Sequence, residues 1–371
     1  MFAPADLHAR VANRHLRPSC PPIIPTGELT VEIRQNTLYV MTQGAYVRRD
    51  HLTVQVEVEG VVKLGVPLHN LEAVVLFGQV MVSPGMLSGC AEAGIAVTFL
   101  SESGRLMARV DAPASGNVLL RREQFRWADR PETALKLSRA FVAGKLHNAR
   151  ANLMRAARED SDHANVFRVT AETQAAGIRR LEFAPDLNTL RGIEGSAAKS
   201  YFESFPLLVR HGGDAFAMKG RTRRPPLDRM NALLSFLYAL LLADCVGALA
   251  AAGLDPSVGF LHADRPAKPS LALDVMEEFR PLLADRLALT LVNRRQVQAD
   301  GFVVREGGAV EMSETTRRDV ITAWRERKKE QVTHLLLEQS MTVGELAHTQ
   351  ARVLARVIRG DVPEYVPCSL K

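Results

Sequence analysis

Apolar and polar residues alternate with a period of two over residues 30–110, the spacing that turns one face of a β-strand toward a core. Residues 52–59 alternate, Gly60 interrupts them, and apolar residues resume at 61–66, which predicts a β-hairpin with one buried face. Residues 83–93 have helical spacing, and the apolar run 95–100 is typical of a buried strand. The pattern predicts a β-rich domain.

After residues 113–116 the period changes to 3.6 and stays there, which indicates helices. We expect them at residues 135–157, 178–183, 187–205, 228–252, 270–292 and 315–337. Asp228 is suited to cap the helix at 228–252, and Gly253 to end it. The chain therefore predicts an α+β fold, with an amino-terminal extension (1–29), a β-rich domain (30–111) and a larger, all-helical domain (117–371).

The composition fits a folded protein of two domains, with 371 residues of which 47% are hydrophobic and 24% charged. The formal net charge of +6 favours a polyanionic partner only weakly, so the placement of the charges matters more than their sum. Basic residues concentrate at 205–230 and 317–329. The first cluster is suited to a phosphate backbone, whereas a solvated helix face is the favoured explanation of the second.

The cysteines and the long apolar stretch bear on location. Cys20, Cys90, Cys245 and Cys368 lie far apart without a C-x-x-C pair, so we expect neither a zinc site nor a disulfide framework, as in a reducing cytoplasm. The start of the chain lacks a signal-peptide pattern. Residues 230–254 are long enough to span a bilayer, but Asp244 in the middle would cost about 3 kcal/mol in lipid. We expect a core helix and no membrane.

Two separated segments carry candidate chemistry. Glu194 stands in RGIEGSAAKSYF, and His262, Asp274 and Glu277 stand in GFLHADRPAKPSLALDVMEEFRP. Asp274 and Glu277, three residues apart, are neighbours on a helix surface, and His262 enters from the preceding loop. Carboxylates and a neutral imidazole that converge from different segments can hold a divalent metal. On spacing alone, solvated helix acids and a loop histidine are the favoured explanation of these residues.

These two blocks, together with RTRRPPLDRMNALLSFLYALL between them, resemble the CRISPR adaptation integrase, the Cas-one family. The amino-terminal half, from LYVMTQGAYVRRD to VPLHNLEAVVLFGQVMVSPGMLSGCAEAGIAVTFLSESGRLMARV, looks like the β-rich domain of that family, with closest similarity to the version in type I-C systems. The resemblance covers about residues 34–367. The first thirty or so residues match nothing recognised in the family.

The resemblance implies a metal-dependent active site in the helical, catalytic domain. Its three metal ligands fall on Glu194, His262 and Glu277, and Asp274 is the additional catalytic acid in the same pocket. The family often has Asp where this chain has Glu277, and the longer carboxylate still reaches a hard cation. Mg²⁺ or Mn²⁺ is implied, because oxygen ligands dominate and Mn²⁺ tolerates an imidazole better.

The reaction that the resemblance implies is transesterification, in which the 3′-hydroxyl of a short DNA duplex attacks a phosphodiester at a CRISPR repeat. Candidate phosphate contacts are Arg223, Arg224, Lys268 and Arg280, each of which alone is equally explained as a surface cation. The implied partners are double-stranded DNA, a second copy of the chain, and a dimer of CRISPR-associated protein two that bridges two homodimers. Two rivals stay open: a stand-alone metal-dependent DNA endonuclease with water as nucleophile, and a non-enzymatic DNA-binding scaffold.

Helical arithmetic separates the two glutamates that follow Asp274. If Pro281 only kinks the helix, the stripe through Met276, Arg280, Leu283 and Leu287 faces the core. Glu277 then lies at the edge of that stripe and Glu278 points away from it. An Arg280 side chain within the stripe requires a carboxylate or phosphate partner. Asn231 and Tyr238, two turns apart on the long helix, are not expected to be catalytic.

Overall fold

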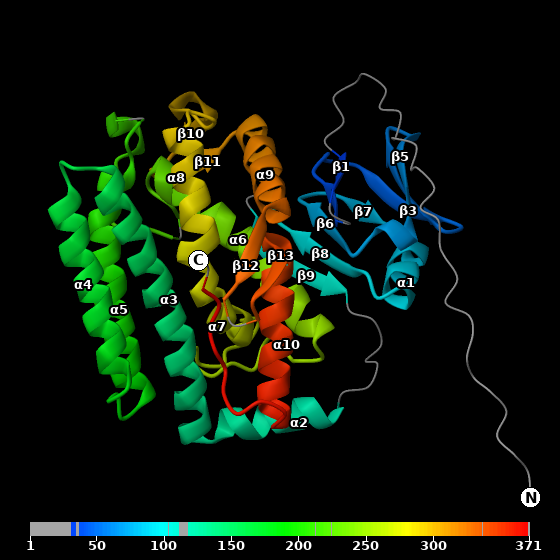
Figure 1. The fold of residues 1–371 in the computed structure, drawn as a ribbon. Helices are drawn as coiled ribbons and strands as arrows, with labels where there is room; N and C mark the ends of the chain where they lie inside the picture. Colours follow the sequence, from blue (N-terminus) through cyan, green and yellow to red (C-terminus); the bar gives the residue numbers. More distant parts are fainter. Residues whose placement is uncertain are drawn as a thin grey trace, which may run out of the picture.

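The computed structural model describes residues 31–34, 37–102, 104–110, 118–211, 213–223, 225–335 and 337–369 (Figure 1). The prediction of an extension at residues 1–29 lies outside them. The β-rich part contains β1 (Val31–Arg34), β2 (Thr37–Val40), β3 (Tyr46–Asp50), β4 (Thr53–Val58), β5 (Val61–Pro67), β6 (Ala73–Phe77), β7 (Met81–Val82), α1 (Pro84–Glu92), β8 (Ala96–Leu100) and β9 (Leu106–Val110). The predicted hairpin is confirmed as the antiparallel pair β4–β5, and the predicted helix and buried strand are α1 and β8.

The strands form a five-stranded sheet in the order β1-β2-β6-β8-β9 and a four-stranded sheet in the order β5-β4-β3-β7. The central strands of the five-stranded sheet, β2, β6 and β8, carry buried residues on both faces. Leu38, Val74 and Val97 pack toward the four-stranded sheet, while Tyr39 and Val75, the next residues along their strands, join the core of the helical part. The period-two alternation therefore serves two cores rather than one core and solvent.

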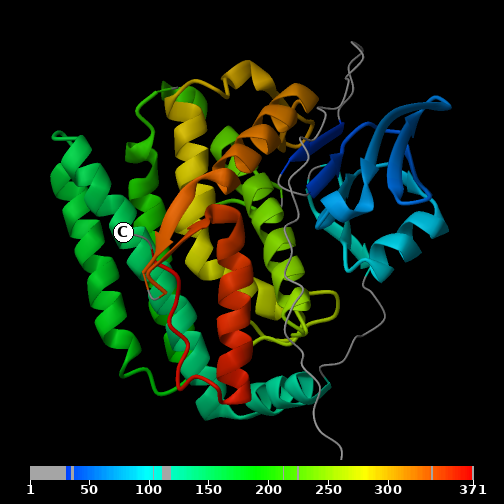
Figure 2. The same ribbon diagram turned by 45° about the vertical axis from the view of Figure 1, so that its right-hand side comes forward.

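The rest of the chain is mostly helical, and it lies beside the sheets in two views (Figures 1 and 2). Its helices are α2 (Val118–Asp129), α3 (Pro131–Glu159), α4 (Ala164–Leu181), α5 (Leu187–Ser204), α6 (Arg229–Ala251), α7 (Ser270–Phe279), α8 (Arg286–Asn293), α9 (Glu314–Lys329) and α10 (Leu346–Arg359). The α+β class, with the β-rich part first, is confirmed. The domain boundaries stay a prediction.

The helical part also holds two short hairpins, β10 (Phe302–Val304) with β11 (Val310–Met312), and β12 (Gln331–His334) with β13 (Gln339–Thr342). The helix expected over residues 315–337 therefore ends early, at Lys329. The basic run that closes α9 favours a helix end, because cations are stabilised by the negative end of the helix dipole. Sequence reasoning did not single out α2 and α10.

Helix α6 is the central helix of this core. The Asp228 side chain accepts a hydrogen bond from the Asn231 amide and caps the helix, and Gly253 follows its end with φ +83°, as expected. By length and composition α6 is able to cross a membrane, but its apolar residues are buried among the other helices. Asp244 within it pairs with Lys328 of α9 at 3.0 Å, which supports a core helix.

Helix α7 continues through a π-helical turn, Arg280–Asp285, into α8. Pro281 lies in this turn, and the wider π geometry accommodates a residue that lacks a backbone N–H. The helix expected over residues 270–292 is therefore confirmed as one continuous rod. All residues of α7 except Leu273 are buried, because it packs against α3, α6 and α10. Gly144 lets α3 approach closely, since a Cβ there would meet Glu278 Cβ at 3.0 Å.

The expectation that Glu278 points away from the core is wrong. Its carboxylate is fully buried and accepts hydrogen bonds from Tyr365 Oη at 2.5 Å and the Cys368 amide at 2.6 Å. The arithmetic assumed one solvent-facing side of the helix, but the carboxyl-terminal segment covers that side. Burial raises the pKa of Glu278 to about 7 although these hydrogen bonds favour its charged form. Glu278 therefore anchors the carboxyl-terminal segment.

Candidate active site

Glu194 of α5 and Glu277 of α7 meet at the ammonium group of Lys145 on α3. Lys145 Nζ donates to Glu194 Oε1 and lies 2.7 Å from Glu277 Oε2. The side chain of Glu277 is 4% exposed, that of Lys145 12% and that of Glu194 24%. Glu277 is therefore the most buried of the three side chains, and Glu194 is the most accessible to solvent. Three helices far apart in sequence thus bring two carboxylates to one cation.

Arg280 completes the charge balance around Glu277. Its Nη1 lies 3.0 Å from Glu277 Oε1, one turn along the same helical rod, so the expected carboxylate partner of Arg280 is present. Burial by itself raises the pKa of Glu277, but the charges of Arg280 and Lys145 outweigh it and hold that pKa well below its usual value. Glu277 is therefore an ionised carboxylate, the form that binds a cation.

Asp274 fixes the position of His262 through hydrogen bonds to its ring and its amide. Asp274 Oδ1 accepts from the His262 ring Nδ1 at 2.7 Å and from its amide at 3.0 Å, and Oδ2 accepts from the amides of Phe260 and Leu261 at 2.6 and 2.9 Å. A carboxylate on Nδ1 leaves the lone pair of the neutral imidazole on Nε2. Asp274 is fully buried and thus shapes the loop that carries His262, rather than facing the opening.

Two residues that the sequence reasoning missed fix this loop. The guanidinium of Arg191, one turn before Glu194 on α5, donates to the Leu261 carbonyl from Nε at 2.9 Å and from Nη2 at 2.5 Å. Gly259 allows the loop to approach α7, because a Cβ there would meet Asp274 Oδ2 at 2.9 Å. Arg191 could have been found from its i, i+3 spacing to Glu194, because residues three apart are neighbours on a helix surface. Nothing in the sequence pointed to Lys145, which lies on a separate helix.

A cavity of about 510 Å³ opens beside the glutamates. Its lining includes Lys145, Glu194, Lys219, Arg221, Arg223 and Arg280. Arg221 Nη1 donates to Asn231 Oδ1 at 2.6 Å and its guanidinium stacks on the Tyr238 ring at 5.2 Å, so it forms part of the cavity wall. Lys219 and Arg223 are exposed. The cavity therefore presents positive charge next to the two carboxylates, an arrangement suited to phosphates.

The chain matches the family model described as CRISPR associated protein Cas1 over residues 38–326. The chain belongs to the Cas1 family. It is 47% identical to the CRISPR-associated endonuclease Cas1 1 of Moorella thermoacetica over 91% of this chain and 99% of that one. It is 48% identical to the enzyme of the same name from Chlorobaculum tepidum, over 90% and 97% of the two chains. The resemblance read from the sequence is thus confirmed for the family, and the type I-C subtype stays a prediction.

Solved structures show the same fold. A Cas1 protein from Thermotoga maritima superposes with a TM-score of 0.76 at 23% identity, over 90% of this chain and all of that one. A casposase bound to its integration product has a TM-score of 0.76 at 19% identity, over 90% and 93% of the two chains. At these identities the likeness is one of fold.

The outcome for the Cas1 ligand set is mixed. Among the described residues no three His, Cys, Asp or Glu side chains are grouped to hold a metal ion. The Lys145 ammonium contacts both Glu194 and Glu277. The donor set nevertheless fits a hard cation. Glu277 Oε2 is buried and, apart from the ion-pair contact of 2.7 Å to Lys145, makes no directed hydrogen bond within the described chain. The assignment of metal ligands stays a prediction.

The remaining candidate residues lie around this centre or outside it. Lys268 is partly buried in the loop after His262, where burial, and then the nearby Arg265, lower its pKa. Arg224 lies outside the described residues. Tyr238 donates to Asp285 at 2.6 Å, and Asn231 donates to the Asp228 side chain at its helix cap and to the Gly220 carbonyl, so both side chains have structural partners. The described cysteines, Cys90, Cys245 and Cys368, are buried and free.

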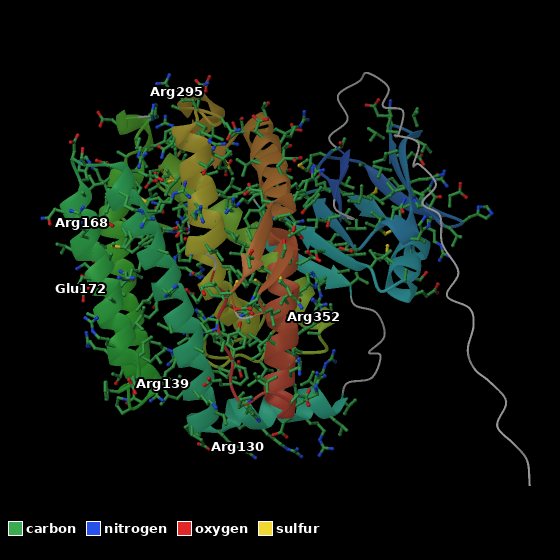
Figure 3. All side chains as sticks on the ribbon, viewed as in Figure 1. Arg130, Arg139, Arg168, Glu172, Arg295 and Arg352 are labelled. Atoms are coloured by element: carbon green, nitrogen blue, oxygen red, sulfur yellow. The ribbon has the colours of Figure 1, made fainter. Side chains whose placement is uncertain are left out.

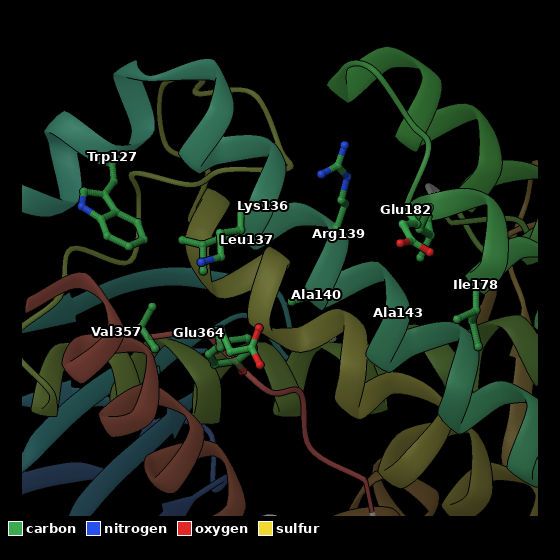
Figure 4. Close-up of a pocket in the computed structure, with 12 residues that line it drawn as sticks. Trp127, Lys136, Leu137, Arg139, Ala140, Ala143, Ile178, Glu182, Val357 and Glu364 are labelled. Carbon is green, nitrogen blue, oxygen red and sulfur yellow. The ribbon is translucent and has the colours of Figure 1, made fainter. Parts of the chain in front are cut away.

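The charged surface and a second cavity do not add to the site. The labelled residues Arg130, Arg168 and Arg295 lie at the edges of the molecule and point outward in Figure 3. The second cavity, of about 280 Å³, lies among α2, α3, α4 and α10, with Trp127, Leu137 and Ala140 in its lining (Figure 4). Its lining lacks the paired carboxylates. The Glu194–Glu277 centre is therefore the candidate active site.

Proposed function

We propose that this protein is a metal-dependent DNA integrase of CRISPR spacer acquisition, which joins the 3′-hydroxyl ends of a short DNA duplex to a CRISPR repeat by transesterification. The observation that carries this proposal is the convergence of Glu194 and Glu277 on one cation at the edge of a basic cavity. Family membership supports it, since the relatives are named CRISPR-associated endonucleases.

Each residue of the site has a chemical task in this proposal. Glu194, Glu277 and the Nε2 of His262 would hold Mg²⁺ or Mn²⁺, which when bound stabilises the charge that builds on the attacked phosphate. Asp274 orients His262 and keeps its Nδ1 protonated. Lys268, Arg223 and, by the sequence resemblance, Arg224 would hold the DNA backbone. Arg280, paired with Glu277, would act through that carboxylate and face the cavity.

We also propose the partners that the family resemblance implied. These are double-stranded DNA, a second copy of the chain, and a dimer of CRISPR-associated protein two that bridges two homodimers in the cytoplasm. One structural neighbour is a Cas6-RT-Cas1–Cas2 complex, with a TM-score of 0.77 at 23% identity over 91% of this chain and 36% of that one. That complex motivates the search for the dimer of CRISPR-associated protein two.

Strand transfer into a repeat-bearing plasmid tests the proposal. A labelled duplex with 3′-hydroxyl ends should become joined to the plasmid in Mn²⁺, and a matched duplex with 3′-deoxy ends should not. Glu194→Ala and His262→Ala should each abolish joining, whereas Glu203→Ala, an exposed carboxylate of the same helix that lines the same cavity, should not. Nicking without joining would favour the endonuclease, and joining by Glu194→Ala would refute the proposed site.

A further inference from the structure

The ammonium of Lys145 stands where the two glutamates would otherwise share a divalent cation. It contacts Glu194 Oε1 and lies 2.7 Å from Glu277 Oε2, so it bridges one oxygen of each. A metal ion bound to the same two oxygens would sit about 2.0–2.6 Å from each of them. The ammonium and the metal ion therefore require the same space and exclude each other.

Charge neutrality explains why a cation is present at this point. Glu277 is 4% exposed and carries two positive neighbours, Lys145 and Arg280, while Glu194 has Lys145. Without Lys145, two negative carboxylates would face each other across a largely buried gap. Arg280 alone would balance one of the two negative charges and leave the other without a partner. Unpaired buried charge is strongly unfavourable, so the lysine stabilises the arrangement of α3, α5 and α7.

The Lys145 ammonium has a second position available in the adjoining cavity. It also lines the cavity that holds Lys219, Arg221 and Arg223, so its side chain borders both the carboxylates and the basic space beside them. Lysine carries its charge on a flexible four-carbon stem, and a rotation of that stem moves the ammonium without moving the helix. Arg280 lacks this freedom, because its guanidinium is fixed between Glu277 at 3.0 Å and the Tyr238 ring at 5.1 Å.

We propose that Lys145 is an exchange cation. Its ammonium holds Glu194 and Glu277 together in the metal-free protein, and it moves into the adjoining cavity, where it contacts a DNA phosphate, when a divalent metal takes its position. This inference rests on the proposed metal site and assigns to it a residue on α3. It makes metal binding and phosphate binding interdependent, because one event releases the group that serves the other.

Mn²⁺ titration of the full chain by calorimetry tests the exchange. Lys145→Met keeps the unbranched side chain as far as Cε and removes the charged ammonium, so Mn²⁺ should bind at least fivefold more tightly than to the wild type. Lys199→Met is the matched control, because Lys199 lines the same cavity and, among the described residues, pairs with Glu203 at 3.8 Å rather than with Glu194 or Glu277. Its affinity should stay within twofold. Equal or weaker Mn²⁺ binding by Lys145→Met would overturn the proposal.

Thermal melting supplies an independent readout. Metal-free Lys145→Met should melt below the wild type and below Lys199→Met, and Mn²⁺ should raise its melting temperature by more than it raises that of the wild type. If Lys145→Met does not fold, Lys145→Gln replaces it in both measurements. An unchanged metal-free melting temperature would show that the ammonium does not hold the glutamates.

DNA binding tests the second half of the exchange. In Ca²⁺ the slope of log affinity against log salt should fall by about one in Lys145→Met, and without a divalent ion it should not change. The same loss in both conditions would show that the ammonium does not move. Absence of saturable Mn²⁺ binding in the wild type and in Lys145→Met would instead refute the proposed metal site itself.

Discussion

Replacing Asp274 by asparagine tests the loop that presents His262. The carboxylate accepts four hydrogen bonds, from the amides of Phe260, Leu261 and His262 and from the His262 ring, at 2.6–3.0 Å. Asparagine is isosteric but offers one oxygen, so its NH₂ group would face two donors in a fully buried place. Each unsatisfied donor costs about 1–3 kcal/mol, which gives about 2–6 kcal/mol for the substitution.

Hydrogen exchange of the loop amides measures this cost locally. At about 1.4 kcal/mol per factor of ten, a loss of 2 kcal/mol lowers the hydrogen-exchange protection factors of the Phe260 and Leu261 amides roughly thirtyfold. Asp264→Asn is the control, because this exposed residue of the same loop accepts a single long hydrogen bond from the part of the chain that the structure describes, from the Gly259 amide at 3.4 Å. Protection that is unchanged in Asp274→Asn would refute the reasoning. Mn²⁺ affinity should also fall about 10–100-fold, since His262 loses the group that orients it.

Three further predictions concern the surroundings of the site. Glu278→Gln should lower the melting temperature, because one oxygen cannot serve both Tyr365 and Cys368; an unaltered melting curve would contradict the anchoring role. Burial raises the pKa of Asp285 to about 6 from 3.8, so the folded state binds this proton more tightly than the unfolded state does. The free energy of unfolding of the wild type therefore falls as pH rises from about 4 to 6. Asp285→Asn lacks this titration, so its free energy of unfolding relative to the wild type should rise by up to about 3 kcal/mol over that range in denaturation curves. Parallel pH profiles of the two proteins would contradict this. Arg223→Glu should lower the slope of log DNA affinity against log salt by about 0.9 or more. Arg130→Glu, a change at an exposed residue at the start of α3, should leave this slope unchanged. Equal slopes in the wild type and both variants would show that Arg223 is a solvated cation.

The parts of the fold that the sequence predicted are those in which local pattern and tertiary packing agree. The hairpin β4–β5, the strand β8 and the helices α3, α5 and α6 each have a clear period and a turn or cap at the end. The end of α9 was missed because its hairpin pairs two polar strands, which carry little periodic signal. The orientation of Glu278 was missed because the segment that covers it arrives from 90 residues downstream.

The site shows the same division. Spacing and family resemblance pointed to Glu194, His262, Asp274 and Glu277, and in the structure the Asp274 carboxylate lies against the His262 ring Nδ1. Arg280 was expected to need a partner because it lies in an apolar stripe, and it pairs with Glu277. Lys145 was not foreseeable, because its partners lie on two other helices and no spacing along the chain connects them.

A crystal of the full chain grown with Mn²⁺ tests the central claim most directly. Anomalous scattering at the manganese edge should show one strong peak between Glu194 and Glu277, within coordination distance of the His262 Nε2. The Lys145 ammonium should be displaced from the two carboxylates in the same map. A peak elsewhere, or Lys145 still bridging the glutamates at saturating Mn²⁺, would contradict the account.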